Sequence, residues 1–179
     1  MLEVLNPVNA YDSIREFLQA GGDVLFAIMI ATFIMWALIL ERVIFFTTAS
    51  AGVRKQAVRA WSNRKDHASW YALAVRDKLL SEVKLASTQN ITVIKGLVAI
   101  APLLGLLGTV TGMVEVFNVM AVTGSSNARL MAGGISKATI PTMAGLVASL
   151  SGILMLNILE ARARATVRDT SEELDKTVG

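Results

Sequence analysis

Three long stretches without a charged residue limit the fold of this chain more than any other feature. They are Val24–Leu40, Gly96–Val114 and Ala138–Leu159. Each falls within the roughly 17–25 residues that a helix needs to cross a bilayer. A segment in lipid must be a helix or part of a closed barrel, because its backbone polar groups find no water there. Barrel strands would be about half as long and would alternate in polarity, so the stretches predict three transmembrane helices.

The composition supports an all-α membrane protein. Of 179 residues, 54% are hydrophobic and 17% are charged, against about 25% charged residues in soluble domains. The chain has no cysteine and a single histidine, His67, which excludes a disulfide scaffold, a cysteine-ligated metal site and a histidine-rich metal centre. It also lacks a phosphate-binding loop and a nucleophile paired with a base. We therefore expect no enzyme, no metal and no cofactor.

The basic residues predict the orientation in the membrane. Residues 42–95 and the tail after the third stretch hold 14 of the 17 lysines and arginines. Three spans place both segments on one side, which the positive-inside rule makes the cytoplasm. The N-terminus and residues 121–134 then face the periplasm. The positive charge is thus a topology signal in contact with lipid, and no nucleic-acid partner is expected.

Helices are also predicted outside the membrane. Residues 9–22 form a short amphipathic pattern with Ile14, Phe17 and Leu18 on one face and Gly21-Gly22 at its end.

The first span is followed by Glu41-Arg42 rather than by a small-residue cleavage site, so we expect no signal peptide. The expected organisation is a periplasmic amphipathic helix 1–22, a first transmembrane helix 23–46, a cytoplasmic helical loop 47–95 turning at Asn63–Asp66, a second transmembrane helix 96–120, a periplasmic loop 121–134, a third transmembrane helix 135–160 that continues into the tail, and a cytoplasmic tail 161–179.

Small residues form stripes on the second and third spans. Gly105, Gly108 and Gly112 share one stripe of the second span. The matching stripe of the third span consists of Ala138, Thr142, Gly145, Ser149 and Gly152. Small stripes allow helices to approach closely in membranes. Two interpretations stay open: the stripes pack against each other within one chain, or they line a central space shared in an oligomer, with Thr142, Gly145 and Ser149 at its wall.

Polar residues mark two levels of the same two spans. If the spans form an antiparallel hairpin, Thr109 and Thr142 lie at matching depth in the middle, and Glu115 and Lys137 lie at matching depth nearer the periplasmic end. Ionisable residues near a bilayer are costly and are often functional. Glu115 and Lys137 are predicted either to pair at the mouth or to reach separately toward water.

The segments APLLGLLGTVTGMVEVF (101–117) and GISKATIPTMAGLVASLSGILMLNIL (134–159) resemble the signatures of the second and third spans in the ExbB/TolQ/MotA proton-channel family. The three-span plan, the large cytoplasmic loop and the helical tail agree with the ExbB branch of a TonB-type energy-transducing system. The resemblance implies a homopentamer whose second and third helices line a pore. That pore would hold a dimer of the single-span partner ExbD, which carries the proton-accepting aspartate, and TonB would receive the work.

The resemblance also assigns residues. The two pore threonines of the family correspond to Thr109 and Thr142, while Lys137 stands where many relatives have glutamate. The alternatives are a TolQ-like subunit of the Tol-Pal envelope system, a self-contained channel and a structural scaffold with packing stripes only. The absence of a titratable group deep in the three stretches counts against a self-contained proton channel.

Overall fold

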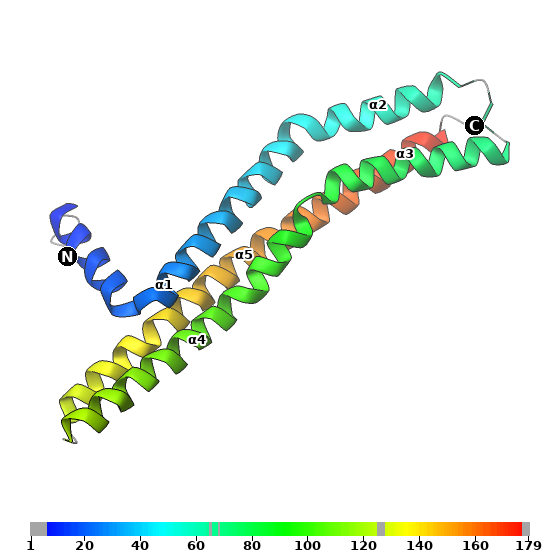
Figure 1. The fold of residues 1–179 in the computed structure, drawn as a ribbon. Coiled ribbons are helices and arrows are strands. Elements are labelled where there is room, and N and C mark those ends of the chain that lie inside the picture. The colour runs from blue at the N-terminus through cyan, green and yellow to red at the C-terminus, as the bar shows by residue number, and fades with distance from the viewer. Residues whose placement is uncertain (1–6, 65, 68, 125–127, 177–179) are drawn as a thin grey trace. The chain divides into compact units, whose positions relative to one another are not determined.

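The computed structural model describes residues 7–64, 66–67, 69–124 and 128–176. Within them it contains five α-helices, one π-helical turn and no strand, as the sequence predicts (Figure 1). The elements are α1 (Pro7–Ile44), the π-helical turn Phe45–Ala49, α2 (Ser50–Ser62), α3 (Trp70–Thr88), α4 (Ile91–Thr123) and α5 (Ala128–Lys176).

Three helical segments are long and apolar enough to cross a membrane. They lie within Gly21–Ser62, Trp70–Val122 and Met131–Asp175. Each contains one of the uncharged stretches, which confirms the three predicted transmembrane helices. Helix α5 runs without interruption to Lys176, so the third span continues into a helical tail as expected.

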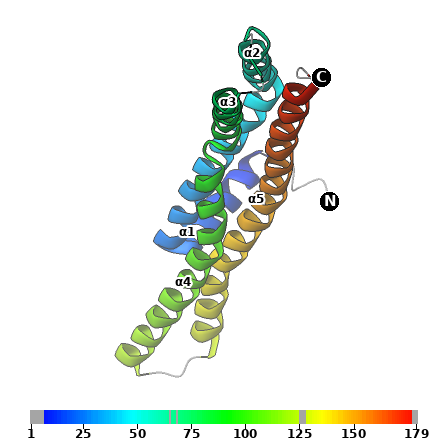
Figure 2. The same cartoon turned by 90° about the vertical axis from the view of Figure 1, so that its right-hand side faces the viewer.

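The chain divides into two compact units. The first contains the residues up to Met35 together with Gly96–Gly152, and the second contains Trp36–Lys95 together with the residues from Ile153 onward. In the first unit α4 and α5 lie side by side and antiparallel (Figures 1 and 2). A Cβ atom added to Gly152 of α5 would lie 2.6 Å from both Met35 of α1 and Val98 of α4. The three spans therefore pack together at Gly152, where α5 has no side chain.

Helix α1 is kinked near its middle. Gly22 has φ 61° and ψ −161°, a conformation that glycine adopts without steric penalty. The kink coincides with the glycine pair predicted to end the amphipathic segment. The side chains of Ile14 and Phe17, which were to form the apolar face of that segment, lie outside the described residues, whereas Leu18 is exposed.

The second unit has a small core around Trp61, near the end of α2. Trp61 is fully buried and packs with Ala72 of α3 and Leu174 of α5. Its indole Nε1 donates a hydrogen bond of 3.1 Å to the carbonyl of Leu174. Arg76 of α3 adds a 2.7 Å bond to Asp175 of α5. The end of α5 is thus anchored on α2 and α3 by one buried aromatic and a peripheral ion pair.

A break between α3 and α4 is the main departure from the predicted helical loop. Asn90 has φ 62°, which asparagine tolerates better than most residues. Its side-chain amide donates to Glu41 at 3.3 Å. Glu41 pairs with the buried Arg42, whose Nη1 donates to the Ala86 carbonyl at 3.0 Å. The end of the first span therefore fixes the point at which α4 begins.

We predict that Trp61→Ala releases the end of α5. Removing a buried tryptophan costs about 3–5 kcal/mol, and the bond to Leu174 is lost with it. Limited trypsin digestion in detergent should then cleave the α5 tail near Arg164 and Arg168 much faster. Trp70→Ala is the matched control, because Trp70 is 80% exposed. Equal digestion of the two variants would contradict the anchoring role.

Candidate functional site

The predicted stripes of small residues face each other across the contact of α4 and α5. A Cβ atom at Gly105 would lie 2.9 Å from the Cα of Thr142, and one at Gly112 would lie 2.8 Å from the Cβ of Ala138. From the other side, a Cβ atom at Gly145 would lie 2.5 Å from the carbonyl oxygen of Ala101. Real Cβ atoms do not approach other atoms so closely, so the two backbones can pack at this distance only if these positions are glycine.

Two hydroxyls bond across the same contact. Thr142 donates to the carbonyl of Gly105 at 2.7 Å, and Ser149 donates to the carbonyl of Val98 at 3.0 Å. Hydroxyl bonds between membrane helices each contribute on the order of 0.6 kcal/mol. Both acceptors belong to α4 of the same chain, and Gly145 also packs on α4, at the carbonyl of Ala101. Within the single chain, α4 therefore already covers Gly145 and Ser149.

Thr109 uses its hydroxyl differently. It donates to the carbonyl of Leu106, three residues earlier on its own helix, at 2.7 Å. In both Thr109 and Thr142 the hydroxyl proton is engaged, while the oxygen keeps lone pairs that accept hydrogen bonds. Pro141 of α5 packs on Gly108 of α4, so the two threonines lie within about one helical turn of each other in depth, as the hairpin register predicts.

Beyond this contact, α4 and α5 present large exposed apolar side chains. On α4 they include Leu103, Leu106, Val110, Val114 and Phe117, and on α5 they include Met143, Leu146, Val147, Leu150 and Leu154. Such faces need either lipid or other protein around them. Thr109 borders this surface, since it is half-buried and lies beside the exposed Val110.

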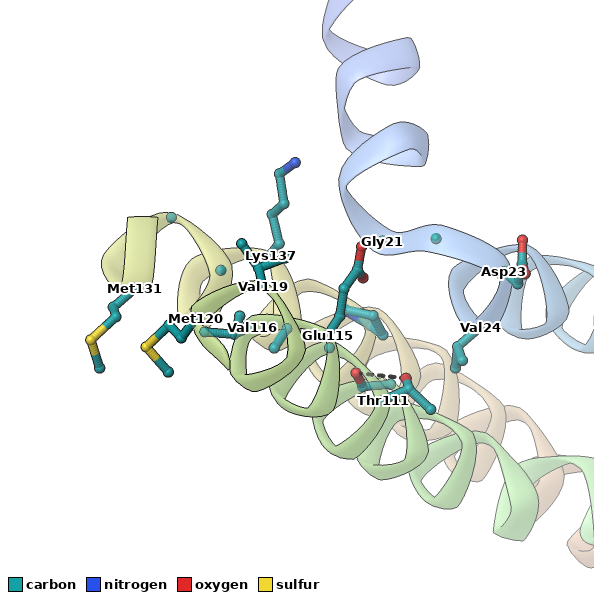
Figure 3. A pocket seen from close by; sticks show the side chains of 17 residues that line it. Gly21, Asp23, Val24, Thr111, Glu115, Val116, Val119, Met120, Met131 and Lys137 are labelled. Atoms are coloured by element: carbon teal, nitrogen blue, oxygen red, sulfur yellow. Dashed lines mark hydrogen bonds between the residues drawn. The ribbon is translucent and has the colours of Figure 1, made fainter. Parts of the chain in front are cut away.

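Glu115 and Lys137 lie in one groove of the first unit (Figure 3). This Glu115 groove has a volume of about 670 Å³ and is lined by Asp23 of α1, Glu115 of α4 and Lys137 of α5, among others. Both predicted partners are exposed, and in the part of the chain that the structure describes no ion pair joins them. The predicted residues thus share a groove without direct contact in the single chain.

Sequence reasoning missed two participants. Asp23 reaches the Glu115 groove only because Gly22 turns the chain there, and Pro141 fills the space above Gly108. Pro141 lies buried inside the continuous helix α5. The ring of a proline on one helix can pack closely against a glycine on the facing helix, because the glycine has no side chain and the proline has no backbone donor to satisfy. The sequence signal available for this contact was the spacing of Pro141 and Gly108 along the hairpin.

Comparison with known proteins points to one family. The profile described as the MotA/TolQ/ExbB proton channel family matches residues 47–172. Among curated proteins, a putative biopolymer transport protein ExbB-like 3 of Synechocystis is 33% identical over 93 residues, covering 51% of this chain and 44% of that protein. The biopolymer transport protein exbB1 of Vibrio cholerae is 41% identical over 75 residues, covering 40% of this chain and 33% of that protein.

The biopolymer transport protein ExbB of Helicobacter pylori is 27% identical over 135 residues, covering 75% of this chain and 77% of that protein. The chain thus spans less than half the length of the Synechocystis and Vibrio relatives and most of the Helicobacter one.

We predict opposite effects for two glycine-to-alanine changes on these helices. Gly145→Ala should destabilise the first unit by about 1–3 kcal/mol, because the new methyl group meets a backbone carbonyl that cannot rotate away. Gly96→Ala should be neutral or stabilise by up to about 1 kcal/mol, because alanine favours helix and nothing lies within 4 Å of that position. The melting temperatures in detergent measure both effects, and equal shifts would refute the close contact.

Proposed function

Because the chain belongs to the MotA/TolQ/ExbB proton channel family, we propose that it is the ExbB-type channel subunit of a TonB-type energy-transducing system. In this role it uses the proton motive force to energise transport of large substrates across the outer membrane. The curated names "biopolymer transport protein ExbB" support this branch of the family. The observation that carries the proposal is the pair Thr109 and Thr142, two hydroxyls at nearly the same depth in two closely packed helices.

The proposed assembly is a pentamer in the bacterial inner membrane that surrounds an ExbD-like dimer. The exposed apolar faces of α4 and α5 support it, since the first span carries its own exposed phenylalanines for lipid contact. Phe26 is 58% exposed and Phe33 is 75% exposed. In this arrangement α4 and α5 face inward and toward neighbouring chains, and α1 faces lipid. The small residues Gly145 and Ser149 then support the pore wall from behind by holding α5 on α4.

The proposed orientation follows the distribution of basic residues. The segment with α2 and α3 and the end of α5 lies in the cytoplasm, and the N-terminus and the connection after α4 face the periplasm. Glu115 and Lys137 then stand at the periplasmic mouth. They line a polar groove there, and pairing between them or with a neighbouring chain would stabilise that mouth.

The threonines would act as hydrogen-bond acceptors in the proton path. Each hydroxyl group donates a hydrogen bond to a backbone carbonyl. Its oxygen can therefore accept a hydrogen bond from water or from a protonated carboxyl group of the partner. Threonine does not titrate near neutral pH, so the proton itself is carried by water and by the partner's aspartate. The pore then orients that acid and controls its exposure to the two sides, and proton passage is converted into motion of the partner helices.

We expect Thr109→Val with Thr142→Val to abolish most of the energised transport. Valine keeps the shape but removes both oxygens, and each lost polar partner costs on the order of 1–3 kcal/mol. Uptake through a TonB-dependent receptor should fall at least about tenfold, while assembly persists. Thr32→Val is the matched control, because Thr32 of α1 donates to Ile28 of the same helix at 2.7 Å. Normal uptake in the double variant would reject the pore assignment.

The ring makes a separate prediction about neighbouring chains. The natural chain has no cysteine, so Val110→Cys with Val147→Cys introduces the only two thiols. Both positions are exposed in the single chain, at 55% and 70%. A short bismaleimide should produce a ladder of covalent oligomers that ends at the pentamer. Phe33→Cys should give little cross-linking if α1 faces lipid, and a ladder from that variant instead would reverse the proposed arrangement.

A further inference from the structure

A second hollow, in the second unit, is unrelated to the proposed proton path. It lies between the junction of α3 with α4 and the part of α5 that follows the third span. We call it the Lys95 pocket. Its volume is about 560 Å³, and its lining includes the cations Lys84, Lys95, Arg164 and Arg168 and the carboxylate Glu160.

The charges in the Lys95 pocket do not balance. Glu160 is shared between Lys95, at 2.5 Å, and Arg164, at 3.5 Å. Among the residues that the structure describes, Arg168 pairs with Asp169 at 3.6 Å and Glu172 at 3.8 Å, both outside the lining. Within the described residues no carboxylate pairs with Lys84. The lining therefore contains four cations and one carboxylate, and this excess of positive charge favours an anion.

The rest of the lining combines three apolar side chains with Thr88 and Thr92. Ile91 is 6% exposed and Ala163 is 3% exposed, and Val167 lies one turn further along α5. A small soluble anion would gain nothing from contact with these apolar side chains. A phospholipid, in contrast, would place its glycerol and first methylene groups against them. Helix α4 also begins at Ile91, which lines the pocket with Thr92, and the N-terminal end of a helix favours negative charge.

The level of the pocket fits the headgroup region of a bilayer. Lys95 directly precedes the uncharged stretch that starts at Gly96, and Glu160 directly follows the one that ends at Leu159. Their ion pair therefore lies at the ends of both uncharged stretches, which in the proposed orientation is the cytoplasmic boundary of the hydrocarbon. Basic pockets between helices at this boundary are suited to phospholipid phosphates.

From this geometry we propose that the Lys95 pocket binds the headgroup of an anionic phospholipid, with its phosphate between Lys84 and Arg168. The Lys95–Glu160 pair stays intact and forms one wall. The site would bring an acidic lipid to the point where α3 turns into α4.

The test uses the full chain in a non-ionic detergent at low salt. Dioleoyl phosphatidylglycerol and dioleoyl phosphatidylcholine are titrated separately, and the apparent Kd is obtained from the rise in melting temperature. We expect phosphatidylglycerol to bind at least about tenfold more tightly. Since a cation near an anionic headgroup contributes about fivefold, Lys84→Gln with Arg168→Gln should weaken phosphatidylglycerol about 25-fold and leave phosphatidylcholine unchanged.

The matched control is Lys55→Gln with Arg59→Gln, which removes the same charge from exposed positions on α2. It should retain selective binding, and both double variants should melt like the natural chain without added lipid. Equal affinity for the two lipids would overturn the proposal, as would an equal loss in the control. Displacement of the lipid by glycerol 3-phosphate at similar concentration would identify a site for a free anion and would also overturn it.

Discussion

The close contact between α4 and α5 is the interaction on which the rest of the structure depends. Lipid provides no hydrophobic drive for two apolar helices to associate, so they associate through packing and a few hydrogen bonds. The glycines at 105, 112 and 145 allow the backbones to meet, and Thr142 and Ser149 then reach carbonyls of the opposite helix. If any of these glycines gained a side chain, the helices would separate and both hydroxyls would lose their acceptors.

This contact also determines which side chains of α4 and α5 are buried and which are exposed. It turns the stripe of small residues inward and leaves the opposite, bulky sides of α4 and α5 exposed. Thr109 and Thr142 lie where the two surfaces meet, engaged with backbone carbonyls through their protons and open through their lone pairs. In the proposed pore, a partner carboxyl group or a water molecule donates hydrogen bonds to these lone pairs without any change in the helices. The second unit has a different task, since it anchors the tail through Trp61 and orders the start of α4 through Arg42 and Asn90.

Much of this was predictable from periodicity and charge. The three spans, the antiparallel hairpin, the turn after α2 and the helical tail each follow from a long apolar run or a consistent spacing. The break at Asn90 was not predictable, because it depends on Glu41, a residue 49 positions away along the chain. For the stripes, the sequence left packing and pore lining open. Gly145 and Ser149 prove to be in contact with α4, a distinction that requires knowing which helix faces them.

The most direct measurement of the central claim is native mass spectrometry of the detergent-solubilised complex, with and without a co-expressed ExbD-like protein. We expect a pentamer of this chain in both samples, and an additional mass equal to a partner dimer in the second. A monomer or dimer as the dominant species under gentle activation would contradict the claim that α4 and α5 build a shared pore. A pentamer that acquires no partner would contradict the proposed role of the threonines, because no partner carboxyl group would then be present to donate to them.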